Sequence, residues 1–157
     1  MRFRQQLAYI IRKNPLLMRM AYVVYRFIQP KYSVGVVGVV VNDDCEVLLV
    51  EHVFHPKLPW GLPGGWIGFN EDPKDTIQRE IQEELGLRVE VETLLLAYRT
   101  EYHHLDFAYL CKPTGEINSL SYELLGYSWF KYEALPRIHS FHYRAIKSAF
   151  TILEAEE

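Results

Sequence analysis

The chain has 157 residues, of which 49% are hydrophobic and 24% charged, a composition typical of a globular protein with one sizeable core. The formal net charge of -3 gives no overall argument for nucleic-acid binding. The only two cysteines, Cys45 and Cys111, lie far apart, which argues against a disulfide framework or a structural zinc site and favours a reducing cytoplasm.

Residues 1–31 are expected to form a basic amphipathic helical arm that differs from the rest of the chain. The arm carries seven Lys or Arg and no acidic residue, whereas residues 32–157 carry ten basic and all twenty acidic residues. Asn14 followed by Pro15 predicts one break between two helical segments, because asparagine caps a helix and proline suits its first turn. Polar residues seven apart predict a narrow stripe on an otherwise apolar surface: Gln5, Arg12, Arg19 and Arg26.

The apolar faces of the arm must be covered, and two interpretations are open. The arm packs on the domain body or on a second subunit, which would make a homodimer, or it rests as a basic amphipathic helix on an anionic membrane surface. Its most apolar run, residues 16–28, is interrupted by Arg19 and Arg26 and is shorter than the roughly 20 residues of a spanning helix. The run also lacks a small-residue cleavage site, so a signal peptide is not expected.

Residues 32–157 are expected to form one domain of strands and helices. VGVVGVVV from Val34, and CEVLLV after the turn Asn42-Asp43-Asp44, predict two β-branched strands. Further strands are expected at VEVETLLLAYR, LDFAYLC and YSWF, and a last helix from about Phe141 to Leu153. Strands on both sides of a central helix, closed by another helix, predict a mixed sheet with helices on its faces.

The central helix has clear predicted limits. Asp72 and Pro73 are typical of a helix start, and Gly86 is typical of a helix end. Apolar residues four apart predict a buried stripe of Ile77, Ile81 and Leu85. Three acidic residues fall on the arc beside that stripe, at the border of the core: Glu80, Glu83 and Glu84.

These three glutamates carry the main functional prediction. On an ordinary solvated helix they would repel each other by roughly 0.2 to 0.5 kcal/mol per pair. Carboxylates partly removed from water take up protons or demand a compensating cation. Hard oxygen ligands at this density suit Mg²⁺ or Mn²⁺, so the helix is expected to contribute to a metal site unless it is simply a solvated face.

The surrounding residues favour the metal site. The pattern G x5 E x7 R E U x E E x G U, in which U is apolar, is complete at Gly65, Glu71, Arg79, Glu80, Ile81, Glu83, Glu84, Gly86 and Leu87. With this box at residues 65–87, the chain resembles the Nudix hydrolases, and the resemblance covers about residues 34–153. It implies an α/β/α sandwich with a mixed sheet and metal-dependent attack of water on a diphosphate linkage.

The resemblance also implies roles for individual residues. Glu80, Glu83 and Glu84 would be metal ligands, together with the backbone carbonyl of Gly65. Arg79 and Glu71 would pair and hold the loop against the helix. The water would be oriented or deprotonated by a box glutamate or by a carboxylate from a later loop, for which Glu123 is the main candidate and Glu116 the weaker one.

Aromatic residues near the box could stack on a nucleobase, although packing in the core or a loop is the simpler interpretation. The substrate-binding candidates are Trp60, Trp66, Phe54 and Tyr102. Tyr102 resembles, weakly, a signature of dinucleoside polyphosphate hydrolases. His52 and His55 flank the loop and are candidates for contact with phosphate, which their spacing does not require, while His103 and His104 are expected on opposite faces of one strand.

The resemblance implies an enzyme acting on a nucleoside diphosphate joined to another group, such as ADP-ribose, an NDP-sugar or a dinucleoside polyphosphate. A nucleoside triphosphate pyrophosphohydrolase with a sanitising role is a second interpretation. A module that binds nucleotides without turnover is a third, although such a module would be expected to lose box carboxylates. No nucleic-acid partner is expected.

Overall fold

The computed structural model describes residues 2–100 and 103–156, and the chain divides into two units, residues 1–31 and 32–157. The first unit contains helices α1 (Arg2–Lys13) and α2 (Pro15–Ile28). Asn14 caps α2 by accepting a hydrogen bond from the Leu17 backbone N–H, which confirms the predicted break. Among the described helices, none combines the length and apolar character that crossing a bilayer requires.

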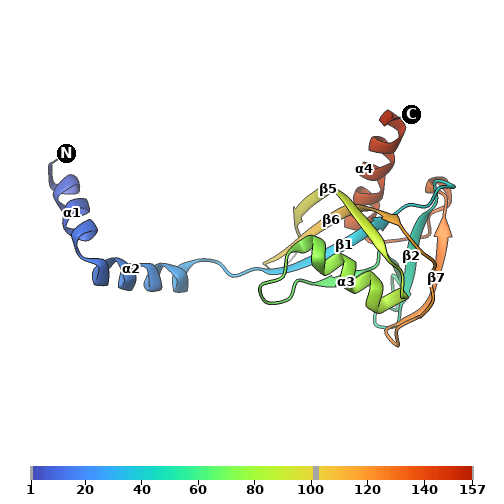
Figure 1. Cartoon of the computed structure of the whole chain (residues 1–157), viewed down its shortest axis with the longest axis horizontal. Coiled ribbons are helices and arrows are strands. Elements are labelled where there is room, and N and C mark those ends of the chain that lie inside the picture. Colours follow the sequence, from blue (N-terminus) through green and yellow to red (C-terminus); the bar gives the residue numbers. More distant parts are fainter. Residues whose placement is uncertain (1, 101–102, 157) are drawn as a thin grey trace. The chain divides into compact units, whose positions relative to one another are not determined.

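The second unit is built on two β-sheets (Figure 1). The four-stranded sheet has the order β4 (Gly64–Trp66), β1 (Ser33–Val40), β6 (His104–Pro113) and β5 (Val89–Arg99). Strands β1 and β6 run parallel, and the other neighbours in this sheet run antiparallel. The antiparallel three-stranded sheet has the order β3 (Trp60–Gly61), β2 (Val47–His52) and β7 (Leu124–Phe130), followed by a 3₁₀ turn at Tyr132–Ala134.

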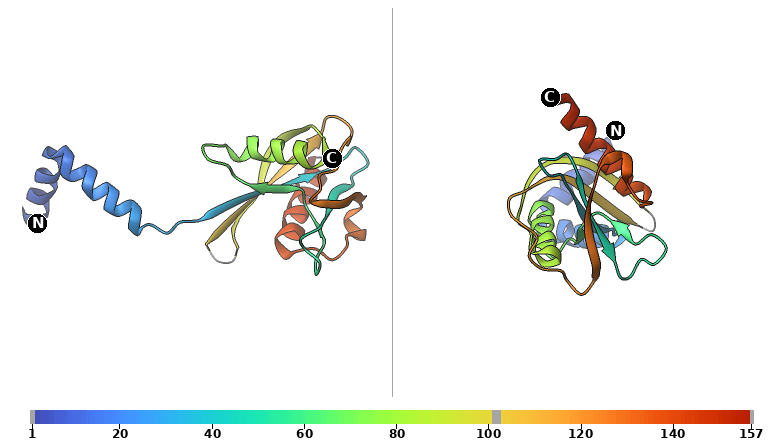
Figure 2. Two further views of the ribbon diagram at one scale, coloured as in Figure 1. Left: turned by 90° about the horizontal axis from the view of Figure 1, so that it is seen from below. Right: turned by 90° about the vertical axis from the view of Figure 1, so that its right-hand side faces the viewer.

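Two helices cover opposite faces of the four-stranded sheet (Figure 2). Helix α3 (Pro73–Leu85) packs on β1, β4 and β5, and helix α4 (Ser140–Glu156) packs on β1, β5 and β6. Side chains of β1 alternate between the two layers: Val36 and Val40 join the core beneath α3, whereas Val39 joins the core beneath α4 and Val37 packs against it. The predicted α/β/α sandwich with a mixed sheet is confirmed.

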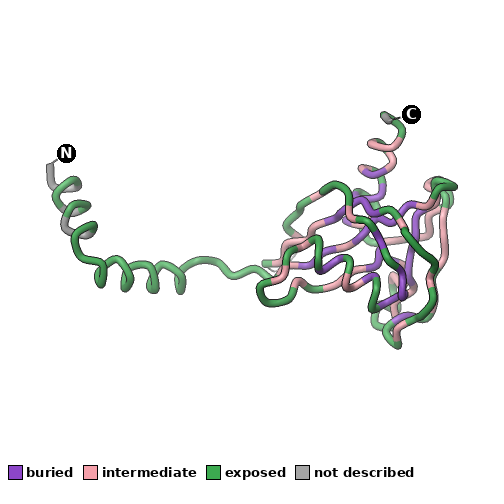
Figure 3. Tube along the Cα trace, in the orientation of Figure 1, coloured by how far each residue is buried: buried purple, intermediate pink, exposed green. Residues whose placement is uncertain are grey.

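The predicted strands and helices of the second unit are all present, and buried residues concentrate there (Figure 3). The first two predicted strands belong to different sheets, and the Val41–Val47 bridge lies just after the end of β1, where the chain turns into β2. The placement of His103 on a strand was wrong: it lies in the turn before β6 with a φ of 61°.

Candidate active site

Helix α3 holds the glutamates at the edge of the core, as its sequence predicted. Asp72 accepts a hydrogen bond from the Lys74 backbone N–H, and Gly86 ends the helix in the left-handed region with a φ of 61°. The predicted stripe is fully buried and consists of Ile77, Ile81 and Leu85. This packing fixes the rotation of α3 and turns the arc that carries the acidic residues toward strand β4.

Two glycines of β4 let the sheet approach this acidic arc. Gly64 has a φ of 153°, and a Cβ there would lie 2.7 Å from the Val37 Cα, so no side chain fits without moving the backbone. A Cβ on Gly65 would instead lie 2.6 Å from Oε2 of Glu80. The absence of a side chain at Gly65 therefore makes the room that the Glu80 carboxylate occupies, whereas Gly64 lets β4 approach the backbone of β1.

Glu84 is the most buried carboxylate of the candidate site, with 8% of the residue exposed. Its Oε2 accepts a hydrogen bond from the Gly64 backbone N–H at 3.2 Å. Burial is the main cause that raises the pKa of Glu84 to about 8, and the negative charges of Glu80, Glu123 and Glu83 raise it further. The hydrogen bond from Gly64 acts in the opposite direction and lowers this pKa. Burial is also the main cause of the raised pKa of Glu80. Such carboxylates are at their most stable when a cation balances them.

Arg79 and Glu71 form the pair that the box pattern implied. Nε of Arg79 donates to Oε1 of Glu71 at 2.8 Å, and Nη2 donates to Oε2 at 3.0 Å, which is a two-point ion pair. Oε2 of Glu71 also accepts a hydrogen bond from the Gly68 backbone N–H at 2.9 Å. The pair thus connects α3 to the loop between β4 and the helix.

The ion pair predicts a pH dependence of stability. Arg79 lowers the pKa of Glu71 from 4.5 to about 2, so the pair stabilises the fold fully above pH 4.5 and is lost as the pH falls through 2. In urea unfolding from neutral pH downward, the stability difference between wild type and Glu71→Gln should close across this interval. The exposed Glu133→Gln variant serves as control. A difference that stays constant on acidification would contradict the role of the pair.

The remaining Nη1 of Arg79 bridges two box glutamates, at 2.9 Å from Oε1 of Glu80 and 3.1 Å from Oε2 of Glu83. Across residues 2–100 and 103–156, no three His, Cys, Asp or Glu side chains are gathered around one point suited to a metal ion. Because Arg79 holds two of the glutamates, a divalent cation would have to compete with the guanidinium for them. The donors still fit such a cation, since they are hard oxygens beside a glycine cradle.

An open cleft of about 620 Å³, here termed the carboxylate cleft, brings several candidates together. It is lined by Glu80, Glu83, Glu84, Glu123, Phe54, Trp66, His52, His55, Gly64, Gly65, Ser121 and Tyr122. Glu123 therefore reaches the box glutamates although it is 39 positions beyond Glu84 in the sequence. Glu116 is exposed and does not line the cleft.

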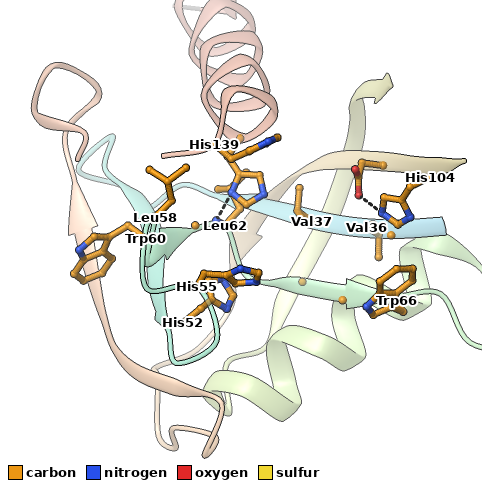
Figure 4. Close-up of a pocket in the computed structure, with 16 residues that line it drawn as sticks. Val36, Val37, His52, His55, Leu58, Trp60, Leu62, Trp66, His104 and His139 are labelled. Atoms are coloured by element: carbon orange, nitrogen blue, oxygen red, sulfur yellow. Dashed lines mark hydrogen bonds and ion pairs between the residues drawn. The ribbon is translucent and has the colours of Figure 1, made fainter. Parts of the chain in front are cut away.

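A second cavity of about 380 Å³, here termed the histidine pocket, adjoins the carboxylate cleft and shares five lining residues with it. These shared residues are His52, His55, Gly64, Gly65 and Trp66. Figure 4 shows His52, His55 and His139 toward one end of the pocket, and Trp66 with His104 at the other. A substrate with one group between the glutamates can place its next group in this pocket.

The histidine pocket offers neutral ring nitrogens. Nδ1 of His142 accepts a hydrogen bond from the Leu62 backbone N–H at 3.1 Å, and burial lowers the pKa of His142 to about 3. Burial and the neighbouring His55 also lower the pKa of His52. At the other end, Asp106 Oδ1 lies 2.9 Å from Nε2 of His104.

The aromatic candidates lie in different surroundings. Trp66 is 64% exposed, faces His104 with a ring distance of 4.8 Å, and lines both cavities. Trp60 lines the histidine pocket but packs edge-on against Phe130 at 5.3 Å, so part of its role is structural. Phe54 is 68% exposed in the carboxylate cleft. Tyr102 lies outside the described residues.

Three titratable residues that line the histidine pocket were not among the candidates from the sequence: Asp106, His139 and His142. The two histidines come from the start of α4 and the turn before it, and nothing in their spacing links them to the box more than 50 positions earlier. Asp106 carried a readable signal, because it is the one charged residue inside the otherwise apolar run LDFAYLC.

Comparisons with known proteins agree with the resemblance that the box at residues 65–87 carries. A model of the NUDIX domain family matches residues 31–149. The chain is 37% identical over 101 residues to the "MutT-like protein" of Streptomyces ambofaciens, covering 64% of each chain. It is 33% identical over 106 residues to the human "8-oxo-dGDP phosphatase NUDT18", covering 64% of this chain and 33% of that protein.

Among solved structures, the MutT NUDIX hydrolase of Burkholderia pseudomallei aligns with a TM-score of 0.67 and 28% identity. The alignment covers 75% of this chain and 98% of that one. The chain thus spans less than two thirds of both curated relatives and nearly all of this bacterial structure.

Proposed function

Because the chain belongs to the NUDIX domain family, we propose that it is a hydrolase that uses a divalent cation to cleave a diphosphate linkage in a nucleotide-derived small molecule. The observation that carries the proposal is the carboxylate cleft, in which the buried Glu84 lies beside Glu80 and the Gly64–Gly65 backbone. The two free cysteines fit a reducing compartment such as the cytoplasm, where we expect the enzyme to act.

Mg²⁺ or Mn²⁺ would be held by Glu80, Glu83 and Glu84 with the carbonyl of Gly65. A cation bound there supplies neutralisation of the diphosphate charge and a lowered pKa of an attacking water. The protein itself positions the ligands, because the guanidinium of Arg79 forms ion pairs with Glu71, Glu80 and Glu83. Glu123 provides a further carboxylate in the cleft that can orient the water or take its proton.

The part of the substrate beyond the diphosphate would occupy the histidine pocket. Its neutral imidazoles, the Trp66 ring and the apolar Val36, Val37 and Leu62 suit an uncharged planar group better than a further phosphate. A nucleoside diphosphate, either free or joined to a sugar or a second nucleoside, therefore fits best. The human relative named 8-oxo-dGDP phosphatase supports this class.

An assay of phosphate release separates the candidates by their products. With Mg²⁺ or Mn²⁺, a nucleoside diphosphate such as 8-oxo-dGDP gives phosphate directly. ADP-ribose or an NDP-sugar gives phosphate only after a phosphatase is added, and a nucleoside triphosphate gives it after a pyrophosphatase. We expect turnover in the first or second arm. Activity in the third arm alone would support the sanitising triphosphate hydrolase, and silence in all three would favour a module without turnover.

Trp66→Ala should raise KM by about tenfold and change kcat little, because stacking of a base on an aromatic ring is worth about 1–3 kcal/mol. The ring is exposed and lies where the two cavities join, so its loss removes a platform without opening the core. Phe69→Ala is the matched control, since Phe69 is fully exposed and lines neither cavity. Equal KM values for wild type and Trp66→Ala would contradict stacking at this position.

A further inference from the structure

Helix α2 buries none of its residues, although it is one of the most apolar segments of the chain. Ten of its fourteen residues are large hydrophobic side chains exposed by 44% or more: Leu16, Leu17, Met18, Met20, Tyr22, Val23, Val24, Tyr25, Phe27 and Ile28. Among the described side chains of residues 1–31, none covers α2 enough to bury any of its residues (Figure 3). A helix with this composition needs a large apolar environment.

The apolar surface of α2 extends around most of the helix. At 100° per residue, the apolar side chains from Val23 to Tyr22 cover an arc of about 260°, and Arg19 and Arg26 share the remaining stripe. A protein surface that receives one helix covers one side of it. At the boundary between headgroups and acyl chains of a bilayer, the acyl chains can contact a helix on three sides. The arginines then extend their guanidinium groups to the headgroups.

The charge of the arm selects the kind of surface. The arm has seven basic residues and no acidic one, so an anionic lipid layer attracts it along its length. The rest of the chain has twice as many acidic as basic residues and would stay in solution above such a layer. With 14 residues and about 1.5 Å of rise per residue, α2 is about 21 Å long and too short to cross the bilayer core.

We propose that residues 1–31 are a peripheral membrane anchor, in which α2 lies in the plane of an anionic bilayer at the boundary between headgroups and acyl chains. Its apolar arc contacts the acyl chains, and Arg19 and Arg26 contact lipid phosphates. The anchor holds the catalytic unit near the membrane surface independently of which nucleotide that unit hydrolyses.

The test is co-sedimentation of the full chain with vesicles of phosphatidylcholine alone, or with about one third phosphatidylglycerol. Wild type should bind the anionic vesicles, and this binding should weaken as the salt concentration rises. Each arginine near an anionic surface contributes roughly a fivefold factor in affinity, so the double variant R19Q/R26Q should bind about 25-fold more weakly. R137Q/K131Q, two exposed basic residues outside the arm, is the matched control and should bind like wild type.

A second variant tests the apolar arc. Leu17 and Val24 lie opposite the arginine stripe, and the double variant Leu17→Ser with Val24→Ser should reduce binding to the anionic vesicles at least tenfold. Circular dichroism and thermal unfolding should match those of wild type, because neither residue is buried. Equal recovery of wild type and both variants would overturn the proposal. It would also be overturned by sedimentation velocity if wild type dimerised, the serine variant did not, and neither bound vesicles.

Discussion

Glu84→Gln should lower kcat/KM by about 10²–10⁴-fold, the range seen when one catalytic carboxylate or charge-stabilising group is removed. Glutamine keeps the size of the side chain and an oxygen that can accept the hydrogen bond from Gly64. It removes the negative charge that a divalent cation needs at the most buried corner of the carboxylate cleft.

The same variant should be more stable than wild type in the absence of metal. The pKa of Glu84 is raised from 4.5 to about 8, so wild type loses stability as the pH rises from 4.5 toward 8. At neutral pH this loss is on the order of 3 kcal/mol, and Gln avoids it. Urea unfolding in chelator, beside steady-state kinetics, measures both quantities.

Asp75→Asn is the matched control for Glu84→Gln, because Asp75 is an exposed carboxylate on the same helix outside the cleft. It should change turnover by no more than twofold. Its free energy of unfolding should stay within a few tenths of a kcal/mol of wild type across the pH range. Unchanged turnover in Glu84→Gln, or a loss of metal-free stability, would show that the carboxylate does not act as assigned.

Gly65→Ala should reduce kcat/KM by about 10²-fold while leaving the fold in place. The three atoms nearest to the added methyl group would all belong to the carboxylate end of Glu80, a flexible side chain that can move aside. Moving it separates Glu80 from the backbone of Gly65, which are two of the assigned cation ligands. Thermal unfolding should shift by no more than a few degrees, and the KM for Mn²⁺ should rise.

Gly64→Ala provides the contrast to Gly65→Ala. Its methyl group would press on the backbone of Val36 and Val37, at a φ that side chains rarely adopt. This variant should lose several kcal/mol of stability or fail to fold. If Gly65→Ala were equally unstable, or fully active, the proposed crowding between Gly65 and Glu80 would be wrong.

The sequence predicted the parts of the site whose geometry is local. Helix α3 carries its own start at Asp72, its own end at Gly86 and its own buried stripe, so the mutual positions of Glu80, Glu83 and Glu84 follow from the helical repeat. The ion pair of Arg79 with Glu71 was also expected, but from the resemblance carried by the box pattern and not from helical spacing.

The histidine pocket could not be predicted in the same way. Its walls come from β1, the segment before β4, β6 and the start of α4, and they meet only when the sheets and helices pack. Hydrophobic alternation predicts that these strands exist, but it does not determine that β1 pairs in parallel with β6. The contacts of Arg79 with Glu80 and Glu83 likewise depend on a rotamer, which sequence spacing leaves open.

Titration calorimetry with Mn²⁺ on wild type and Glu84→Gln tests the central claim most directly, namely that the carboxylate cleft is a divalent-cation site. We expect saturable uptake by wild type, at least tenfold weaker uptake by Glu84→Gln, and unchanged uptake by the Asp75→Asn control. Absence of heat from wild type, or identical isotherms for wild type and Glu84→Gln, would contradict this claim.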